Sequence, residues 1–574
     1  MKRFIFTTMI AGLLALSGCY DLDRAPFDQP SSSTFWQTES QCKQGIMGVY
    51  SSLRPDDYLG KQFITDINSD IAAGYDNYAP ITDGTATART GFMNNKWSSI
   101  YESVQSANNA IRNVSAAQID ATKRDQMIGE AKFLRALGYF YLVNYFGGVP
   151  IYDETTDVNK DFNNLTKPRA SVTEVYAQII KDLTDAIAVL PVSWATADLG
   201  RATKGAAYAL RGKAYLYQKN YKNAITDLEE VTKPTYNYNL NSSFKDLFLP
   251  GGDGSSEMIF LVNNMGGTGN PYGMPFAFYA GTRSTYGSCW NNAVAGVDLA
   301  DLYEYTDGKP FSWEELFPGY TQNNTIKNKV WYVTVNSTLD AVTAEPAEAQ
   351  TIKDMFAKRD PRLAATVITP YSHYAGWASN APKDMYFVFA KNTAGAIQTL
   401  NETKGFIRNN KGGWETYFWR KFVPEGNMNG LITDRQHTPI NWPVIRLADV
   451  YLMLAEAYNE DGNQAKAVEY INKVRARVKM PAINSGPAWL EATTKEQVFQ
   501  RIFRERAFEL ANEGHRDMDL RRWKLSEQML NNKVELGVTG KAMLTRKFTQ
   551  RDYLWPIPAT EIEMNPALTQ NPGW

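Results

Sequence analysis

Cysteine, histidine and long apolar runs are scarce in this chain of 574 residues, and each scarcity excludes a class of protein. Three cysteines are too few for a fold held together by disulfides. The three histidines, His373, His437 and His515, are isolated and show no zinc-ligand spacing. Beyond the N-terminal segment no stretch reaches 18 apolar residues, so no transmembrane helix is expected there.

The charge balance and the absence of common catalytic motifs narrow the function further. The chain has 60 basic and 61 acidic residues and a formal net charge of −1, with no basic block. This balance argues against nucleic acid as a partner. No Gly-x-Ser-x-Gly, His-Glu-x-x-His or P-loop motif occurs, and no cofactor or metal site is predicted. Glycosidase carboxylates have no fixed sequence spacing, so a glycoside hydrolase stays an open alternative.

The first residues have the pattern of a secretory signal peptide. Lys2 and Arg3 precede a mostly apolar stretch over 4–16, which is too short for a membrane-spanning helix. The stretch leads into Leu16-Ser-Gly-Cys19, which resembles a bacterial lipobox. We therefore expect residues 1–18 to be a lipoprotein signal peptide. The alternative is an ordinary cleaved signal followed by a chance cysteine.

If the lipobox is real, Cys19 is the first mature residue and carries the lipid. Several acyl chains, at roughly 0.8 kcal/mol per buried methylene, anchor a folded protein firmly to a bilayer. Residues 19–34 are polar and contain Pro26 and Pro30, which is typical of a flexible tether. Without residues 1–18 the chain has 58 basic and 61 acidic residues, a net charge near −3.

Helical periodicity dominates residues 35–235. One predicted helix ends at Gly147-Gly148, and another is expected over 171–190 because Ser171 and Glu174 form a capping-box pattern. The apolar face of the first helix recurs at spacings of three and four. Its members are Met127, Ala131, Leu134, Gly138, Tyr141 and Tyr145.

Segments 207–228 and 455–471 repeat each other. Seven positions match at a constant offset of 243, with small residues on one helix and larger apolar ones on the next. This pattern is typical of a tetratricopeptide helical hairpin, in which small side chains let antiparallel helices approach closely. The alternative is that two unrelated amphipathic hairpins look alike.

Residues 441–574 are predicted to be helical with an extended tail. A capping box at Thr493 to Glu496 is expected to start a helix that runs through Glu513. From Trp555 the chain is rich in proline, so we expect an extended tail held by Trp555 and Trp574. Three glutamates at i, i+4 spacing share a helix face, and interleaved arginines favour an ion-pair network over a metal site. The glutamates are Glu505, Glu509 and Glu513, and the arginines are Arg504, Arg506 and Arg516.

Residues 236–440 lack helical periodicity. Glycine is dense at 251–254 and 266–269, and aromatic residues lie among turn signals, with short β-favouring stretches at 330–335 and 385–389. The sequence therefore predicts a mostly α-helical scaffold with a few short β-strands and a loop-rich, ligand-binding excursion. Function commonly lies on loops that a rigid scaffold positions.

Several ordered motifs together resemble the SusD/RagB family of outer-membrane nutrient-binding lipoproteins. Each is weak alone, but they follow the family's order and cover nearly the whole chain after residue 18. The motifs are Gly129-Glu-Ala-Lys-Phe-Leu-Arg-Ala136, Tyr145-Phe-Gly-Gly-Val-Pro150, Asp182-Leu-Thr-Asp-Ala186 with Leu190-Pro191, Val444-Ile-Arg-Leu-Ala-Asp-Val-Tyr-Leu-Met-Leu-Ala-Glu-Ala-Tyr458, Ile471-Asn-Lys-Val-Arg475, Arg504-Glu-Arg-Ala-Phe-Glu-Leu510, Glu513-Gly-His-Arg516, Asp519-Leu-Arg-Arg-Trp523, Leu554-Trp-Pro-Ile-Pro558, and Asn565-Pro566 with Gln570-Asn-Pro-Gly573.

This resemblance implies a SusD-like fold and a non-enzymatic function. The protein would be lipid-anchored on the outer face of the outer membrane and would pair with a SusC-like TonB-dependent transporter. It would capture a glycan, or in some members a peptide, for import. The sequence does not name the glycan.

Aromatic residues of the loop-rich region are the main candidate ligand contacts. A flat ring packs against the C–H face of a sugar, while polar side chains take its hydroxyls. The preferred segment is 279–292, a polar loop without helical period, although a single aromatic ring of this region is more often buried than ligand-binding. The candidates in this region are Tyr279, Arg283, Tyr286, Cys289, Trp290, Trp377 and Tyr386. Trp97, by contrast, is predicted to pack inside the scaffold.

A second group of candidates is rich in oxygen atoms. Asp66, Asn68 and Asp70 resemble the start of a calcium loop, but Ile71 replaces the required glycine, so an EF-hand is excluded. The loop could instead bind sugar hydroxyls, with Tyr75 and Tyr78 nearby, or be a solvated loop. Arg359, beside the structural pair Asp360 and Arg362, is a further candidate. Whether Cys42 and Cys289 pair is left open.

Overall fold

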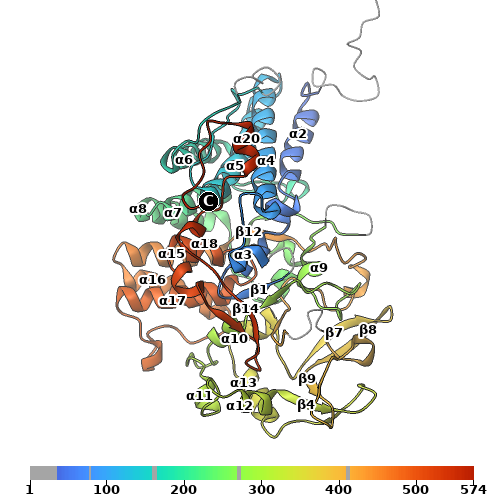
Figure 1. Cartoon of the computed structure of the whole chain (residues 1–574). Helices are drawn as coiled ribbons and strands as arrows, with labels where there is room; N and C mark the ends of the chain where they lie inside the picture. Colours follow the sequence, from blue (N-terminus) through green and yellow to red (C-terminus); the bar gives the residue numbers. More distant parts are fainter. Residues whose placement is uncertain (1–34, 76–78, 158–164, 268–272, 409–413) are drawn as a thin grey trace, which may run out of the picture.

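The computed structural model describes residues 35–75, 79–157, 165–267, 273–408 and 414–574. Within these ranges the protein is mostly α-helical, with short two-stranded sheets and one sheet of four strands, as predicted. Helices form the upper and left parts of Figure 1, and the loop-rich segment with β4, β7, β8 and β9 forms the lower right part. Among the described residues, none of the helices combines the length and the apolar character that spanning a membrane requires.

The N-terminal helices pack side by side, with α5 between α4 and α6. Helix α5 (Ala121–Phe146) ends where Gly147 takes a positive φ of 75°, a conformation that favours glycine. Ser171 caps α6 (Val172–Val189) through the predicted capping box with Glu174. Both predicted helices are thereby confirmed. The further helices of this part are α2 (Glu39–Ser51), α3 (Ala79–Asp83) and α4 (Gly91–Ala116).

Two helical hairpins confirm the internal repeat. The first consists of α7 (Lys204–Tyr217) and α8 (Tyr221–Val231), and the second of α15 (Leu447–Glu460) and α16 (Gln464–Arg477). The offset of 243 relates the first and last residues of α7 to those of α15 (204 to 447, 217 to 460) and the first residue of α8 to that of α16 (221 to 464). Helix α8 packs on α15, so the hairpins stack on each other although residues 232–446 lie between them in the sequence.

Helix α17 (Lys495–Leu510) differs from its prediction at both ends. Its capping box joins Thr494 and Gln497, one residue later than expected. It ends at Leu510 instead of Glu513, because residues 511–514 turn and Gly514 adopts a φ of 74°. A Cβ on Gly514 would lie 2.5 Å from the Gln62 carbonyl oxygen, so this close approach requires glycine.

The loop-rich region, residues 236–440, contains several short paired strands. Strand β2 (Met258–Val262) pairs with β12 (Trp442–Arg446), which brings both ends of the excursion together. The hairpin of β7 (Ser372–Ala378) and β8 (Ala381–Phe387) is the longest paired segment here. The other strands are β1 (Ala72–Gly74), β3 (Ala293–Ala295), β4 (Tyr332–Val335), β5 (Val342–Ala344), β6 (Val367–Ile368), β9 (Phe389–Lys391), β10 (Ile397–Gln398), β11 (Phe418–Trp419), β13 (Val534–Leu536) and β14 (Ala542–Thr545).

Short helices complete the excursion and the C-terminal part. They are α9 (Phe276–Ala280), α10 (Val297–Leu302), α11 (Trp313–Leu316), α12 (Asn324–Trp331), α13 (Ala349–Ala357), α14 (Pro361–Thr366), α18 (Arg516–Arg522), α19 (Ser526–Leu530) and α20 (Ala559–Met564). The tail is extended apart from α20, which the prediction missed. Trp555 is buried and stacks on Tyr145, and the Trp574 indole donates to the Arg551 and Leu554 carbonyls, so both tryptophans hold the tail as predicted.

An ion-pair network fills the centre of the C-terminal part. Glu509 accepts from Arg446 at 2.6 Å and Arg362 at 3.1 Å, and also pairs with Arg477. The network itself was predicted, but its partners were not: Glu505 pairs with Arg362 and Arg475, and Glu513 with Arg446 and Lys421. Arg506 forms ion pairs with Asp449 and Asp519, and Arg516 forms one with Asp70.

Candidate functional site

The half-exposed ring of Trp290, on the loop that follows α9, lies beside two aromatic residues of α9 itself. Trp290 is 43% exposed, and its ring centre lies 4.6 Å from that of Phe278 and 6.5 Å from that of Tyr279. The Trp290 backbone N–H donates to the Phe278 carbonyl at 2.7 Å, and the Asn292 N–H to the Tyr279 carbonyl at 2.6 Å. These bonds fold the loop back on α9 and hold Trp290 at the surface.

A second pair of rings extends this surface onto the β7–β8 hairpin. Tyr286 and Trp377 meet with ring centres 5.0 Å apart at 62°, an edge-to-face contact. The Trp377 N–H donates to the Ser284 carbonyl at 2.7 Å, which ties the hairpin to the loop. We refer to Tyr279, Tyr286, Trp290 and Trp377 as the aromatic platform.

Arg435, which the sequence analysis did not single out, fixes the shape of the platform loop. Its guanidinium donates to the carbonyls of Gly287 and Ser288, both at 2.7 Å, and lies 4.9 Å from the Phe278 ring centre. Gly287 has a φ of 72°, and a Cβ there would lie 2.8 Å from the Arg435 Cβ. Every residue has a backbone carbonyl, so the sequence does not mark Gly287 and Ser288 as the partners of Arg435, and its role could not be predicted.

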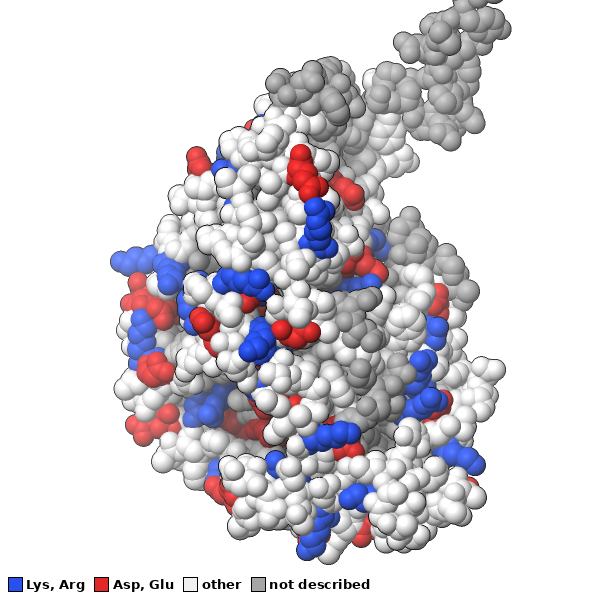
Figure 2. Space-filling view, in the orientation of Figure 1, with Lys and Arg blue, Asp and Glu red and all other residues white. Residues whose placement is uncertain are grey.

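The platform is suited to equilibrium binding of a flat, partly apolar ligand. Partly exposed rings offer large contact area at a small loss of side-chain entropy, because each has few rotatable bonds. Arg283, which is partly exposed, lies on the same loop as Trp290, and its guanidinium is a hydrogen-bond donor group. Surface charges of both signs are interspersed on the face shown in Figure 2, without a block of one sign.

Asp66, Asn68 and Asp70 lie inside the protein, which corrects their prediction as ligand contacts. The Asp66 carboxylate accepts from the backbone N–H groups of Gly514 and Arg516, both at 3.1 Å, and the side chain is 1% exposed. Burial raises the pKa of Asp66 to about 7. Asp70 holds the Arg516 guanidinium through two bonds of 2.8 Å. These oxygens join the N-terminal part to the turn after α17.

Arg359 is also structural, which corrects its prediction as a ligand contact. Its guanidinium is buried and donates to the carbonyls of Ala300 and Tyr303, both at 2.6 Å. Arg362 beside it forms the expected pair with Asp360, at 2.7 Å. An arginine committed to backbone carbonyls in the core cannot reach a ligand at the surface.

The other candidates surround the platform in different ways. Tyr75 is buried, and its hydroxyl donates to the Trp290 carbonyl at 3.1 Å, so it supports the loop from below. Cys289 is a buried free thiol, and burial raises its pKa to about 12, so it cannot contact a ligand from the surface. Tyr386 stacks on His373 and donates to Glu345, and the strand register places it on the same face of the β7–β8 hairpin as Trp377. Tyr78 lies outside the described residues.

Two further expectations concern packing and sulfur chemistry. Trp97 is buried against Tyr101 and Phe146, as predicted. Cys42 is free as well, so the two cysteines of the described residues do not pair. Within the described ranges no group of three His, Cys, Asp or Glu side chains could hold a metal ion.

Fold and site together define a class of protein: an α-helical repeat scaffold that displays aromatic rings on long loops. Models of known families match almost the whole chain. Residues 256–574 match the SusD family, residues 22–216 a family described as "Starch-binding associating with outer membrane", and residues 205–233 the tetratricopeptide repeat. The SusD match covers more than half of the 574 residues, and the chain belongs to the SusD family.

Curated relatives and solved structures agree with this assignment. SusD-like protein P2 of Formosa agariphila is 24% identical over the whole of both chains. Starch-binding protein SusD of Bacteroides thetaiotaomicron is 25% identical over 78% of this chain and 72% of that protein. A SusD-like carbohydrate-binding protein from Bacteroides fragilis has a TM-score of 0.74 at 24% identity, covering 93% of this chain and all of that one. A laminarin-binding SusD-like protein has a TM-score of 0.66 at 24% identity, covering 94% and 100%.

Proposed function

We propose that this protein is a surface glycan-binding lipoprotein that captures an oligo- or polysaccharide on the aromatic platform and passes it, chemically unchanged, to a SusC-like TonB-dependent transporter. The observation that carries the proposal is the Trp290 ring, held half-exposed beside other rings by an ordered loop. Membership of a family with starch-binding and laminarin-binding members supports a saccharide as the ligand.

The central test is a comparison of two tryptophans with similar exposure. Trp290 is 43% exposed on the platform, whereas Trp489 is 40% exposed far from it in sequence, beside Asp307. Affinity electrophoresis and calorimetry with laminarin, starch, xylan, mannan and fructan identify the glycan. Trp290→Ala should then weaken its binding by roughly 1–3 kcal/mol, the value of one stacked ring. Trp489→Ala should leave it unchanged. Equal affinities of both variants and the parent protein would remove Trp290 from the site.

Two alternative functions give different results in the same set of experiments. A glycoside hydrolase would release reducing ends from a bound polysaccharide, whereas a capture protein leaves the polymer length unchanged. An oligopeptide-binding member of the family would retain peptides and ignore every saccharide of the panel. Either result would replace the proposal.

The anchor and the partner are tested in cells. Cys19, the proposed lipidation site, lies outside the described residues. Cys19→Ala should release the exported protein from the outer membrane, because the acyl chains supply the membrane affinity. Protease treatment of intact cells reports whether the protein faces the exterior. Co-purification of a TonB-dependent barrel protein tests the partner, and its absence under gentle solubilisation would count against delivery.

A further inference from the structure

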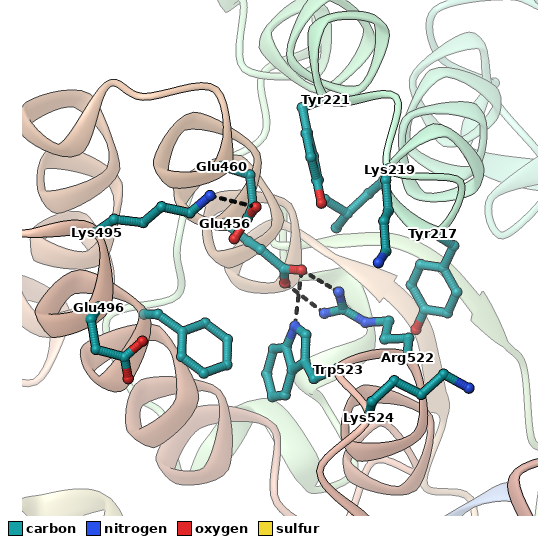
Figure 3. A pocket seen from close by; sticks show the side chains of 12 residues that line it. Tyr217, Lys219, Tyr221, Glu456, Glu460, Lys495, Glu496, Arg522, Trp523 and Lys524 are labelled. Atoms are coloured by element: carbon teal, nitrogen blue, oxygen red, sulfur yellow. Dashed lines mark hydrogen bonds and ion pairs between the residues drawn. The ribbon is translucent and has the colours of Figure 1, made fainter.

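A separate cavity lies in the helical half of the molecule, on the opposite side of Figure 1 from α9, β7 and β8. It has a volume of about 430 Å³ and opens between the ends of α7 and α15 and the start of α17 (Figure 3). Pockets of about 300–1,000 Å³ are the usual size for small ligands. The cavity therefore has room for one or two sugar rings or a compound of similar size.

The floor of this cavity is rigid and electrically balanced. Glu456 is 4% exposed and accepts from Arg522 at 2.6 Å and from the Trp523 indole N–H at 3.0 Å. Arg522 also pairs with Asp519 at 2.8 Å. Because these groups satisfy one another, they fix the orientation of Trp523 and leave ligand selection to the side chains above them.

The walls combine aromatic rings with carboxylates. Tyr221, Phe499 and Trp523 border the cavity, and the ring centres of Phe499 and Trp523 lie 5.3 Å apart at an interplanar angle of 84°. Glu460, paired with Lys495 at 2.9 Å, and Glu496 lie on the α15–α17 side. Carboxylates accept hydrogen bonds but do not donate them, so they suit ligands that carry hydroxyl groups.

Two lysines border the opposite wall in an unusual backbone conformation. Lys219 and Lys524 have φ angles of 61° and 62°, in the left-handed region, which is strained for residues that carry a Cβ. Burial and the charge of Lys219 lower the pKa of Lys524, which lies over the Tyr553 ring. Lys219 lines the cavity, as Figure 3 shows, and within the described residues its ammonium makes no ion pair.

We propose that this cavity is a second binding site, specific for an anionic sugar unit with a carboxylate or a sulfate group. The anion pairs with Lys219, the sugar ring packs among Tyr221, Phe499 and Trp523, and Glu460 and Glu496 accept from its hydroxyls. A saccharide fits better than a peptide, because the lining offers side-chain acceptors for hydroxyls beside flat rings and no strand edge for a peptide backbone. The site is independent of the platform and holds even if the platform binds nothing.

Calorimetry of the folded mature protein with glucuronate, glucose 6-sulfate and glucose tests this site. We expect at least one anion to bind at least about 10-fold more tightly than glucose, because a charge-assisted bond is involved. Lys219→Gln should abolish that preference. Lys222→Gln, a change of an exposed lysine in the first turn of α8, should leave it unchanged. Circular dichroism confirms that both variants are folded.

The outcomes separate this site from the platform and from other ligands. Trp290→Ala should leave binding of the anionic sugar unchanged, whatever it does to a polysaccharide. Equal binding of glucose and both anions, no binding at all, or full retention of the preference in Lys219→Gln would overturn the proposal. Tighter binding of a tripeptide carboxylate than of either anionic sugar would assign the cavity to peptides and refute the saccharide class.

Discussion

Removing the charge of Glu509 should destabilise the protein far more than removing a surface charge. Glu509 is fully buried and accepts from three guanidinium groups, those of Arg362, Arg446 and Arg477. Burial opposes its ionisation, but the charges of Arg477, Arg446 and Arg362 outweigh that effect and hold its pKa below the ordinary value. Glu509→Gln keeps the shape and leaves buried positive charge without its counter-ion.

The expected loss is about 3–5 kcal/mol of unfolding free energy, the cost of breaking a buried ion pair on one side. The matched control is Glu469→Gln, because Glu469 pairs with Lys466 and Lys473 on the exposed face of α16. Exposed pairs of this kind contribute about 0–1 kcal/mol. Urea titrations followed by circular dichroism and tryptophan fluorescence measure both changes. A loss below about 1 kcal/mol for Glu509→Gln, or equal losses in both variants, would refute the reasoning.

Three further predictions follow from buried groups and from one glycine. Burial, with the charge of Lys213, lowers the pKa of His515 from 6.5 to about 4. The stability that depends on the neutral imidazole is therefore present above pH 6.5 and is lost as the pH falls through 4. NMR titration of the His515 imidazole should give a midpoint near pH 4, and a midpoint near 6.5 would contradict the prediction. Cys42 and Cys289 should resist alkylation at pH 8 until the protein unfolds, because both thiols are buried and burial raises both pKa values; rapid labelling of the folded protein would count against this. Gly287→Ala should cost roughly 1–2 kcal/mol of stability and weaken glycan binding, because φ is 72° there and Arg435 leaves no room for a Cβ; unchanged binding would separate the loop from the site.

Local and repeated features of the fold could be predicted from sequence. A capping box depends on residues three positions apart, so Ser171 and Glu174 were enough to predict the start of α6. The predicted N-cap of α17 was wrong by one residue, because Thr493 and Thr494 both carry a hydroxyl that can cap a helix, and the structure uses Thr494. The repeat offset of 243 was predictable because the pattern of small and large side chains is itself periodic.

Long-range partners could not be predicted in this way. Glu505 and Arg362 are separated by 143 residues, and nothing near either one in the sequence marks the other as its partner. Asp66 has the polar neighbours of a solvent-exposed loop, yet its acceptors are used by backbone N–H groups about 450 residues away. Of the candidate site, individual rings such as Trp290 and Trp377 could be selected by type and region. Their arrangement with Tyr286 required the folded chain, and that they bind a ligand stays a prediction.

The contacts between Asp66, Asp70 and the turn at Gly514 and Arg516 set when the molecule can finish folding. They span 446 to 450 residues, so a ribosome must make about nine-tenths of the chain before these carboxylates meet their donors. Contacts between such distant positions form late, since a very large loop must close first. Helices α4, α5 and α6 are neighbours in sequence and pack on one another, so they can assemble early, whereas their connection to the turn after α17 has to wait for the C-terminal part of the chain.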